Sequence, residues 1–379
     1  MKTYRKNARF SVKPAGTLAL AIALAGCLSF PSLAFAKVKV DETELAQGEN
    51  AVGGGTATLV ETALDMIGVT ASELFIDEDL SVNFNGENDI DLVKVEGSAE
   101  VNMDFSGDNE VDDFAIGGQV DVTIEANGHN EFEEVTASGD SNVTINVTGE
   151  NDFEEINGYD DASITIQGTD CQKKDIINLG EDENDASILT EDGDLVIDHA
   201  TVNLESKVAD IGSTGGDVKI DTSKIARDDD NECTSIVAGG TMDISESVID
   251  IAGTVRSVDK MTIEHSDVKV EAPDSEYDDS VPYRVFSYTG IDLIGEKNGE
   301  VKEGDLDGQK VSYVDTGDGD DVDLKADGKP AYYNCGTPAP AAQPLPKTDD
   351  ESNPLLPLIA ALASAACVAF AARRKRLDA

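Results

Sequence analysis

Alternating apolar and polar residues recur along the chain with a fixed period between residues 80 and 164. Four stretches each place three apolar residues two positions apart, with polar residues between most of them. The apolar residues are Leu80/Val82/Phe84, Val101/Met103/Phe105, Val122/Ile124/Ala126 and Val143/Ile145/Val147. The interval from one stretch to the next is constant, since they start at positions 80, 101, 122 and 143. The pattern predicts short β-strands that each bury one face.

The same polar signature follows every stretch: a glycine, then two residues later an asparagine, then an acidic, an apolar and another acidic residue. The glycines are Gly86, Gly107, Gly128 and Gly149, and the asparagines are Asn88, Asn109, Asn130 and Asn151. One such unit cannot bury its own apolar face, so consecutive copies should stack with equivalent residues in columns. We therefore predict an all-β parallel β-solenoid, a right-handed β-helix, with coils of about 21 residues. The stacked asparagines should form a ladder of amide hydrogen bonds.

Beyond residue 164 the strict period ends, but the strand pattern continues. Four segments align without gaps: 195–204, 218–227, 242–251 and 261–270. The intervals between their first positions are unequal, which predicts coils with loops of unequal length. In its strand-turn-strand periodicity, residues 194–271 resemble the parallel β-helix repeats of pectate-lyase-like and carbohydrate-binding surface proteins. That resemblance implies a fold more than an activity.

The N-terminus is typical of a secretory signal peptide. Several basic residues precede an apolar stretch at 17–28, and Ala34-Phe35-Ala36 forms a small-x-small cleavage site, so we expect cleavage after Ala36. Residues 24–27 also fit a lipoprotein signal that would place a lipid on Cys27, and this alternative stays open.

The C-terminus carries Leu345, Pro346, Lys347 and Thr348, then a polar spacer, an apolar stretch at 355–372 and four basic residues. This arrangement resembles the cell-wall sorting signal of Gram-positive surface proteins, Leu-Pro-x-Thr-Gly. The resemblance implies that a sortase cuts after Thr348 and joins the chain to peptidoglycan, with membrane contact only through the apolar span. Asp349 replaces the family's glycine, which leaves a sortase of altered preference or a plain single-span anchor as alternatives.

These features divide the chain into seven parts. They are a signal peptide at 1–36, an N-terminal cap at 37–79, regular repeats at 80–170, irregular coils at 171–275, a β-rich C-terminal cap at 276–334, a Pro/Ala linker at 335–344 and the sorting segment at 345–379. Caps are expected because the open apolar ends of a solenoid must be covered.

The chain is strongly acidic, with 77 acidic and 28 basic residues and a net charge of −49. The signal peptide and the part of the chain after Thr348 hold four acids and nine bases, so 73 acidic and 19 basic residues remain between them, a charge of −54. No basic stripe exists to neutralise phosphates, so nucleic-acid binding is excluded. The acidity alone fits solubilisation or adaptation to salt.

The repeat register sharpens the meaning of that charge. One predicted column holds Asp89, Glu110, Glu131 and Asp152, and a second holds Asp91, Asp112, Glu133 and Glu154. Unit charges about 4.8 Å apart repel by about 1 kcal/mol in water. Because Ca²⁺ prefers several carboxylate oxygens, both columns and the acidic loop at 318–323 are candidate calcium sites. The sequence requires no other cofactor.

Catalytic chemistry has little support. The only histidines, His129, His199 and His265, are far apart in the repeat register and are expected at the surface beside turns. We therefore expect a non-enzymatic, wall-anchored solenoid that serves as an adhesin, stalk or interaction module, outside a Gram-positive cell. The alternatives are a polysaccharide-binding protein, with or without the help of calcium and using Tyr283 and Tyr288, or a polysaccharide lyase or glycoside hydrolase. The sequence does not name the host or neighbouring-cell ligand.

Overall fold

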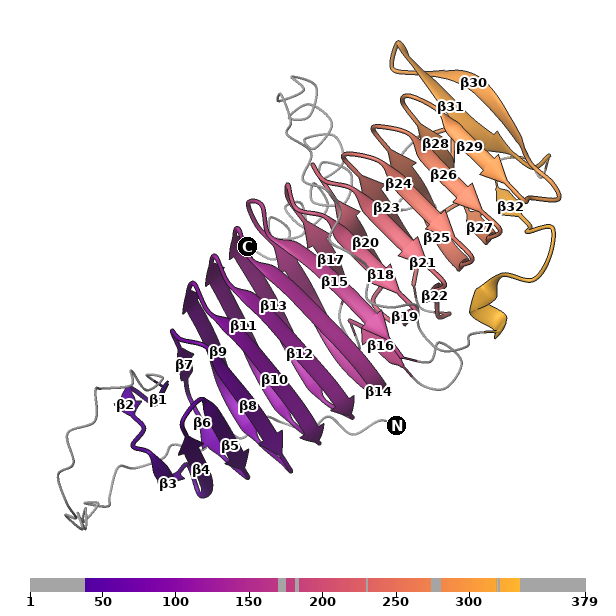
Figure 1. Cartoon of the computed structure of the whole chain (residues 1–379). Helices are drawn as coiled ribbons and strands as arrows, with labels where there is room; N and C mark the ends of the chain where they lie inside the picture. Colours follow the sequence, from indigo (N-terminus) through magenta and orange to yellow (C-terminus); the bar gives the residue numbers. More distant parts are fainter. Residues whose placement is uncertain are drawn as a thin grey trace, which may run out of the picture. The chain divides into compact units, whose positions relative to one another are not determined.

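The protein forms an all-β parallel solenoid of about ten coils (Figure 1). The structure, a computed structural model, describes residues 38–169, 175–180, 184–229, 231–273, 281–317, 319 and 321–334. The predicted signal peptide, Pro/Ala linker and sorting segment lie outside these residues.

The regular coils each contain two strands. Sheet 1 takes β8 (Leu80–Asn85), β10 (Glu100–Gly107), β12 (Asp121–Gly128), the first half of β14 (Asn142–Gly158) and β15 (Ser163–Gly168). Sheet 2 takes β9 (Asp89–Gly97), β11 (Glu110–Gly118), β13 (Glu131–Gly139) and the second half of β14. All of these pairings are parallel, and Val101 pairs with both Leu80 and Val122. The predicted coil length of about 21 residues is therefore confirmed.

The irregular coils mostly contain three strands, because sheet 2 divides at β14. Residues 150–153 of β14 pair with β16 (Ile176–Leu179), and residues 155–158 pair with β17 (Asp185–Thr190). Sheet 1 continues through β18 (Leu195–Asp198), β21 (Val218–Asp221), β24 (Met242–Ser245), β26 (Met261–Glu264) and β29 (Ile291–Ile294). Sheet 2 continues through β19 (Thr201–Leu204), β20 (Val208–Ser213), β22 (Lys224–Arg227), β23 (Cys233–Ala238), β25 (Val248–Ser257), β27 (Asp267–Glu271) and β28 (Val285–Ser287).

The alignment of the four irregular segments agrees with the strand register. Leu195 pairs with Val218, Val218 with Met242, and Met242 with Met261. The apolar columns of sheet 1 thus run unbroken while the loops between coils vary in length.

Both ends of the stack are closed by antiparallel strands. At the first end lie β1 (Val38–Val40), β2 (Thr43–Glu44), β3 (Gly48–Val52), β4 (Gly55–Val60), β5 (Ala63–Ile67), β6 (Thr70–Ala71) and β7 (Leu74–Ile76). β3, β4 and β5 form an antiparallel meander, yet β5 also pairs in parallel with β8. The parallel stack therefore begins inside the segment predicted as a cap.

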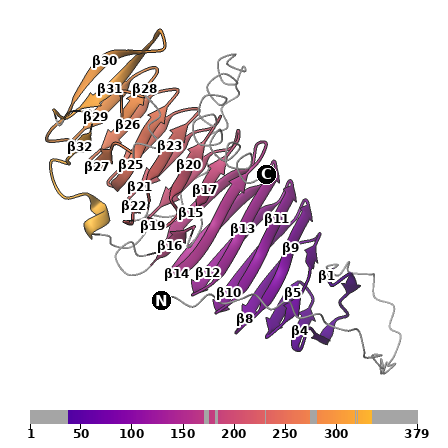
Figure 2. The same ribbon diagram turned by 180° about the vertical axis from the view of Figure 1, so that it is seen from behind.

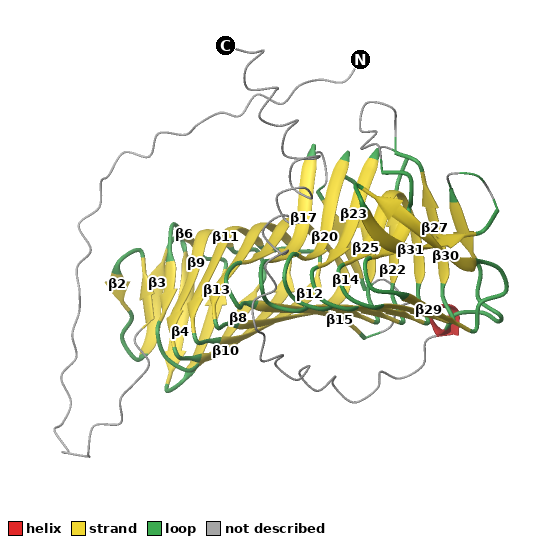
Figure 3. Ribbon diagram, turned by 90° about the horizontal axis from the view of Figure 1, so that it is seen from above, coloured by secondary structure: helices red, strands yellow, loops and turns green. Residues whose placement is uncertain are grey.

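The other end carries β30 (Glu300–Leu306), β31 (Gln309–Asp315), β32 (Val322–Leu324) and the 3₁₀-helix η1 (Ala331–Asn334), seen from behind in Figure 2. β30 and β31 form a hairpin, and β32 lies antiparallel to β27. η1 is the helix drawn in red in Figure 3.

The interior is filled by columns of apolar side chains. Phe84 stacks on Phe105 with ring centres 4.1 Å apart, and Phe132 stacks on Phe153 at 4.7 Å. Burying each such ring contributes about 2 to 3 kcal/mol. The glycine turns permit coils to approach closely: Gly118 has φ of 108°, and a Cβ there would lie 2.5 Å from the Gly97 carbonyl oxygen.

Candidate functional site

The two predicted carboxylate columns lie on the outside of sheet 2. Glu110 pairs with Asp89 and with Glu131, and Glu131 pairs with Asp152, so the first column is continuous across four coils. Burial, and then the charges of Glu131 and Asp89, raise the pKa of the Glu110 carboxyl. Burial, followed by the charges of Asp91 and Asp89, likewise raises the pKa of Asp112 in the second column. Charge repulsion thus acts both along and between the columns.

Each coil contributes one carboxylate to each column. Within the described ranges, no group of three or more His, Cys, Asp or Glu side chains is arranged to hold a metal ion. At the last position of the first column, Asp152 accepts a hydrogen bond from Asn178 Nδ2 at 2.8 Å. The loop at 318–323 is only partly described, and its Asp321 carboxylate accepts the Ala272 backbone N–H at 2.9 Å. Calcium binding stays a prediction.

The four repeated asparagines form one buried row between the sheets. Each side-chain amide donates to the side-chain oxygen of the next asparagine, at 2.8 Å from Asn88 to Asn109, 2.8 Å from Asn109 to Asn130 and 2.7 Å from Asn130 to Asn151. The row ends on backbone groups, because the Val69 N–H donates to Asn88 and Asn151 donates to the Ala126 carbonyl. Every asparagine side chain in the row therefore finds a partner without water.

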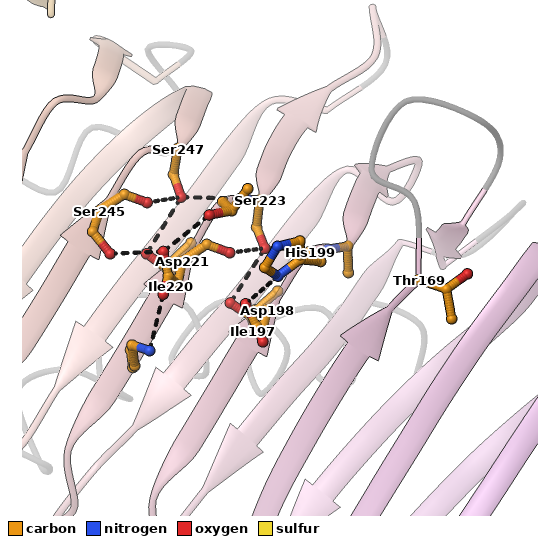
Figure 4. Close-up of polar contacts among 12 residues, drawn as sticks. Thr169, Ile197, Asp198, His199, Ile220, Asp221, Ser223, Ser245 and Ser247 are labelled. Carbon is orange, nitrogen blue, oxygen red and sulfur yellow. Dashed lines mark hydrogen bonds and ion pairs between the residues drawn. The ribbon is translucent and has the colours of Figure 1, made fainter. Parts of the chain in front are cut away.

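A second polar ladder, which the sequence analysis missed, joins the irregular coils, and Figure 4 shows its members Ser223 and Ser247. The hydroxyl of Ser247 accepts the Ser223 backbone N–H at 3.0 Å, and the hydroxyl of Ser266 accepts the Ser247 N–H at 3.1 Å. The Glu296 carboxylate takes the next place and accepts the Ser266 N–H at 3.0 Å. All three serines occupy the sixth position of the aligned segments, which is the signal that could have revealed them.

The residue before each ladder position has a left-handed backbone. The column consists of His199, Thr222, Glu246, His265 and Gly295, with φ between 47° and 72°. This conformation is uncommon for residues other than glycine. It turns the chain sharply between the two sheets, and the hydroxyl of Ser223 stabilises its turn by donating to the Asp221 carbonyl at 2.7 Å.

The histidines do not converge, but their burial differs from expectation. His129 is exposed as predicted, with 68% of its side chain accessible, at 3.7 Å from Asp152. The prediction for His199 was wrong: the residue is 9% exposed, and its Nδ1 lies 2.6 Å from Asp198 Oδ1 (Figure 4). Its place in the turn column accounts for the burial.

The two tyrosines predicted to bind sugar both pack against another aromatic ring. Tyr283 stacks on Tyr313 at 4.3 Å, and Tyr288 packs edge-on against Phe286 at 5.8 Å, so both rings are partly covered by a neighbouring ring. Phe75 in β7 instead lies in a cavity of about 380 Å³ that is also lined by Lys39, Glu42, Glu73 and Lys94.

Another cavity, of about 370 Å³, lies beside the irregular coils. Its lining residues are Arg227, Asp228, Asp229, Asn231, Asp250 and Lys269. Arg227 and Lys269 both form ion pairs with Glu271. The positive charges of this cavity are therefore largely neutralised within the protein.

In the described part of the chain, no helix is long and apolar enough to cross a membrane. The sorting motif at 345–348 and the apolar span at 355–372 lie outside it. Comparison of the chain with family models, with curated proteins and with solved structures finds no match.

Proposed function

We propose that the protein is a non-enzymatic cell-surface module, an acidic β-solenoid anchored to a Gram-positive cell wall, that acts as an adhesin, stalk or interaction module. The observation that carries this proposal is the surface of the regular coils. Rows of carboxylates repeat at the coil spacing on a frame whose interior is filled with apolar side chains. Such a frame holds chemical groups at fixed intervals, which suits repeated weak contacts with a partner.

The termini support the location. The chain leaves the last described element, η1, directly before the Pro/Ala linker at 335–344, which is suited to act as an extended spacer. The sorting-like motif and apolar span follow. Peptidoglycan, joined through a sortase, is the partner that this order implies, with no role for nucleic acid.

Fractionation of a Gram-positive host that expresses the full chain tests the location. We expect the mature protein to resist detergent extraction and to be released by a peptidoglycan hydrolase. Thr348→Ala should abolish release by the hydrolase, whereas Asp349→Gly, which restores the family motif, should retain or increase it. Complete extraction of the unaltered chain by detergent would contradict wall attachment and favour a plain membrane anchor.

Polysaccharide binding is the second candidate, and the cavity at Phe75 favours it. Protein sites for sugars commonly combine an apolar aromatic surface with a few charged or polar groups, and this cavity contains both. Lyase or hydrolase chemistry has less support, since His129, His199 and His265 lie in different coils. Calcium would assist binding only if the carboxylate columns take up cations, which is tested below.

A further inference from the structure

The cavity at Phe75 is formed by three neighbouring strands of sheet 2 in the first coils. β7 lies between β1 and β9, and its Phe75 pairs with Lys39 on one side and Lys94 on the other. Leu74 and Ile76, on either side of Phe75 along β7, are completely buried. The alternation of a strand therefore turns Phe75 outward, and the three side chains form a short row on the outer face.

An outward-facing phenylalanine is exceptional in this protein. Among the seven phenylalanines of the described residues, Phe75 alone is not buried. The ring sits between two ammonium groups, with Lys39 Nζ at 5.1 Å and Lys94 Nζ at 6.0 Å from its centre. These distances are those of cation–π contacts, which hold both lysines at the edge of the cavity.

The two lysines differ in their counter-charges. Lys94 forms an ion pair with Glu96 at 2.8 Å, which raises its pKa. Lys39 is exposed, and no carboxylate among the described residues forms an ion pair with its ammonium. The cavity thus offers one ammonium without an ion-pair partner among the described residues, beside an aromatic ring, together with the carboxylates of Glu42 and Glu73.

The cavity lies at one end of the stack. The coils follow one another in chain order from β5 through β8 and β10 to β29. β7 therefore belongs to the coil at one end, while the segment with the sorting motif follows the opposite end. In a wall-anchored protein, the first coil is the part farthest along the stack from the anchored end.

We propose that this cavity binds the terminal sugar of a glycan, and that this sugar carries a carboxylate. The sugar ring packs against the part of the Phe75 ring that the two lysines leave open, its carboxylate pairs with Lys39, and its hydroxyls donate to Glu42 and Glu73. This inference deepens the glycan-binding candidate of the proposed function, on which it rests for its biological setting but not for its test.

The chemistry of the lining selects this class of ligand. Lys39 gives a ligand carboxylate a partner that a neutral sugar would leave unused. Glu42 and Glu73 can accept hydrogen bonds from sugar hydroxyls. A free inorganic anion would make no use of the ring. A volume of about 380 Å³ suits one sugar residue, as at the end of a glycan chain.

Binding of polymer-linked sugars to the purified full-length chain in detergent micelles tests the proposal. The probes are terminal glucuronic acid, terminal sialic acid and terminal glucose. Glucose matches glucuronic acid except that a hydroxymethyl group replaces the carboxylate. We expect at least one acidic probe to bind about tenfold more tightly than glucose. Lys39→Gln should remove that difference and Phe75→Ala should abolish binding, whereas Phe75→Tyr should retain it.

Lys310→Gln is the matched control, since Lys310 is an exposed lysine of the hairpin at the other end of the stack. It should leave binding unchanged. Equal binding of all three probes, binding of none, or unaltered binding by Lys39→Gln would overturn the proposal. Because the protein is purified, this result is independent of wall attachment, and either proposal can fail without the other.

Discussion

The regular and irregular coils stack in the same way but differ in their balance of acidic and basic residues. Residues 80–168 contain 22 acidic residues and one basic residue, Lys94, whereas residues 184–334 contain 36 acidic and 13 basic residues. Strict repetition places each repeated acid next to its equivalents, as in the column through Glu110 and Glu131. The variable coils interrupt such columns with bases, and Lys219 pairs with Asp221 at 3.0 Å. A strict repeat therefore accumulates charge that an irregular one can neutralise.

The polar ladders differ in the same way. The asparagine ladder joins side chain to side chain, so each member depends on both neighbours. The serine ladder joins each hydroxyl to a backbone N–H of the adjacent coil, so each contact is more nearly independent. We expect the regular coils to be more sensitive to a single substitution inside their ladder.

The largest effect should come from the glycine column of the regular coils. Gly86 and Gly107 both have positive φ, but a Cβ on Gly107 would lie 2.8 Å from the Gly86 oxygen, whereas one on Gly86 would contact nothing within 4 Å. Gly107→Ala should reduce the free energy of unfolding by about 3 to 4 kcal/mol, and Gly86→Ala by about 1 to 2 kcal/mol. Denaturant unfolding measures both. Equal losses of unfolding free energy in the two variants would show that the close approach of Gly107 to Gly86 does not destabilise Gly107→Ala.

The next effect concerns Asp210, a partly buried acid of the irregular coils. Burial raises the pKa of the Asp210 carboxyl from 3.8 to about 6, against the opposing charge of Arg256. The folded state then holds this proton more tightly than the unfolded state does. The associated stability is present below pH 4 and is lost as pH rises from about 4 to about 6. Asp210→Asn should therefore increase the free energy of unfolding by about 2 to 3 kcal/mol above pH 6 and flatten this part of the pH profile.

Glu110→Gln is the counterpart in the regular coils. Partial desolvation and the neighbouring carboxylates raise the pKa of Glu110, but most of its side chain remains in contact with solvent. Glu110→Gln should therefore increase the free energy of unfolding by less than Asp210→Asn does. This increase should shrink in high salt, whereas that of Asp210→Asn should not. Unfolding curves at pH 5 and pH 8, each at low and high salt, compare the two. A salt-sensitive Asp210 effect would contradict its assignment to burial.

The ladders provide the third comparison. Asn130→Ala leaves the Asn109 amide without its acceptor and should cost about 2 kcal/mol, whereas Ser247→Ala removes one acceptor of a backbone N–H and should cost about 1 kcal/mol. Asn102→Ala is the control, since Asn102 is exposed in β10. Equal melting temperatures for Asn130→Ala and Asn102→Ala would show that the asparagine ladder does not stabilise the fold.

The smallest effect concerns cations at the carboxylate columns. If the columns bind calcium, micromolar to millimolar Ca²⁺ should raise the melting temperature by about a few degrees more than Mg²⁺ or Na⁺ at matched ionic strength. The double substitution Glu131→Gln and Glu133→Gln should abolish the calcium response and increase stability in chelator. The same change at Glu300 and Glu303, which lie near lysines, should preserve the response. If calcium and sodium act alike, the columns are a solvated surface.

The fold could be predicted from the sequence wherever side chains repeat at a fixed interval. The constant period identified the strands and the columns through Asn130 and Glu131, because stacking places equivalent residues together. The serine ladder was missed because serine is a common turn residue, although its fixed position in the aligned segments was visible. The burial of His199 depends on the left-handed turn it occupies, which no local pattern specified.

The cavity at Phe75 was beyond sequence reasoning for a different reason. Phe75 and Lys94 lie about one coil apart in parallel strands, but Lys39 reaches them only because β1 joins β7 in antiparallel fashion outside the repeat. Non-periodic pairing of this kind cannot be read from hydrophobic alternation. The parallel pairing of β5 with β8 was missed likewise, because its register, with Leu64 beside Val82, is shorter than the period of the regular coils.

The central claim, that this acidic solenoid is displayed on a cell wall, is tested most directly by the C-terminus of the mature protein. Mass spectrometry of chain released from a Gram-positive host by a peptidoglycan hydrolase identifies that end. The account predicts a C-terminal peptide that ends at Thr348 and carries a peptidoglycan fragment. A mature chain that ends at Ala379 with no attached fragment would contradict it.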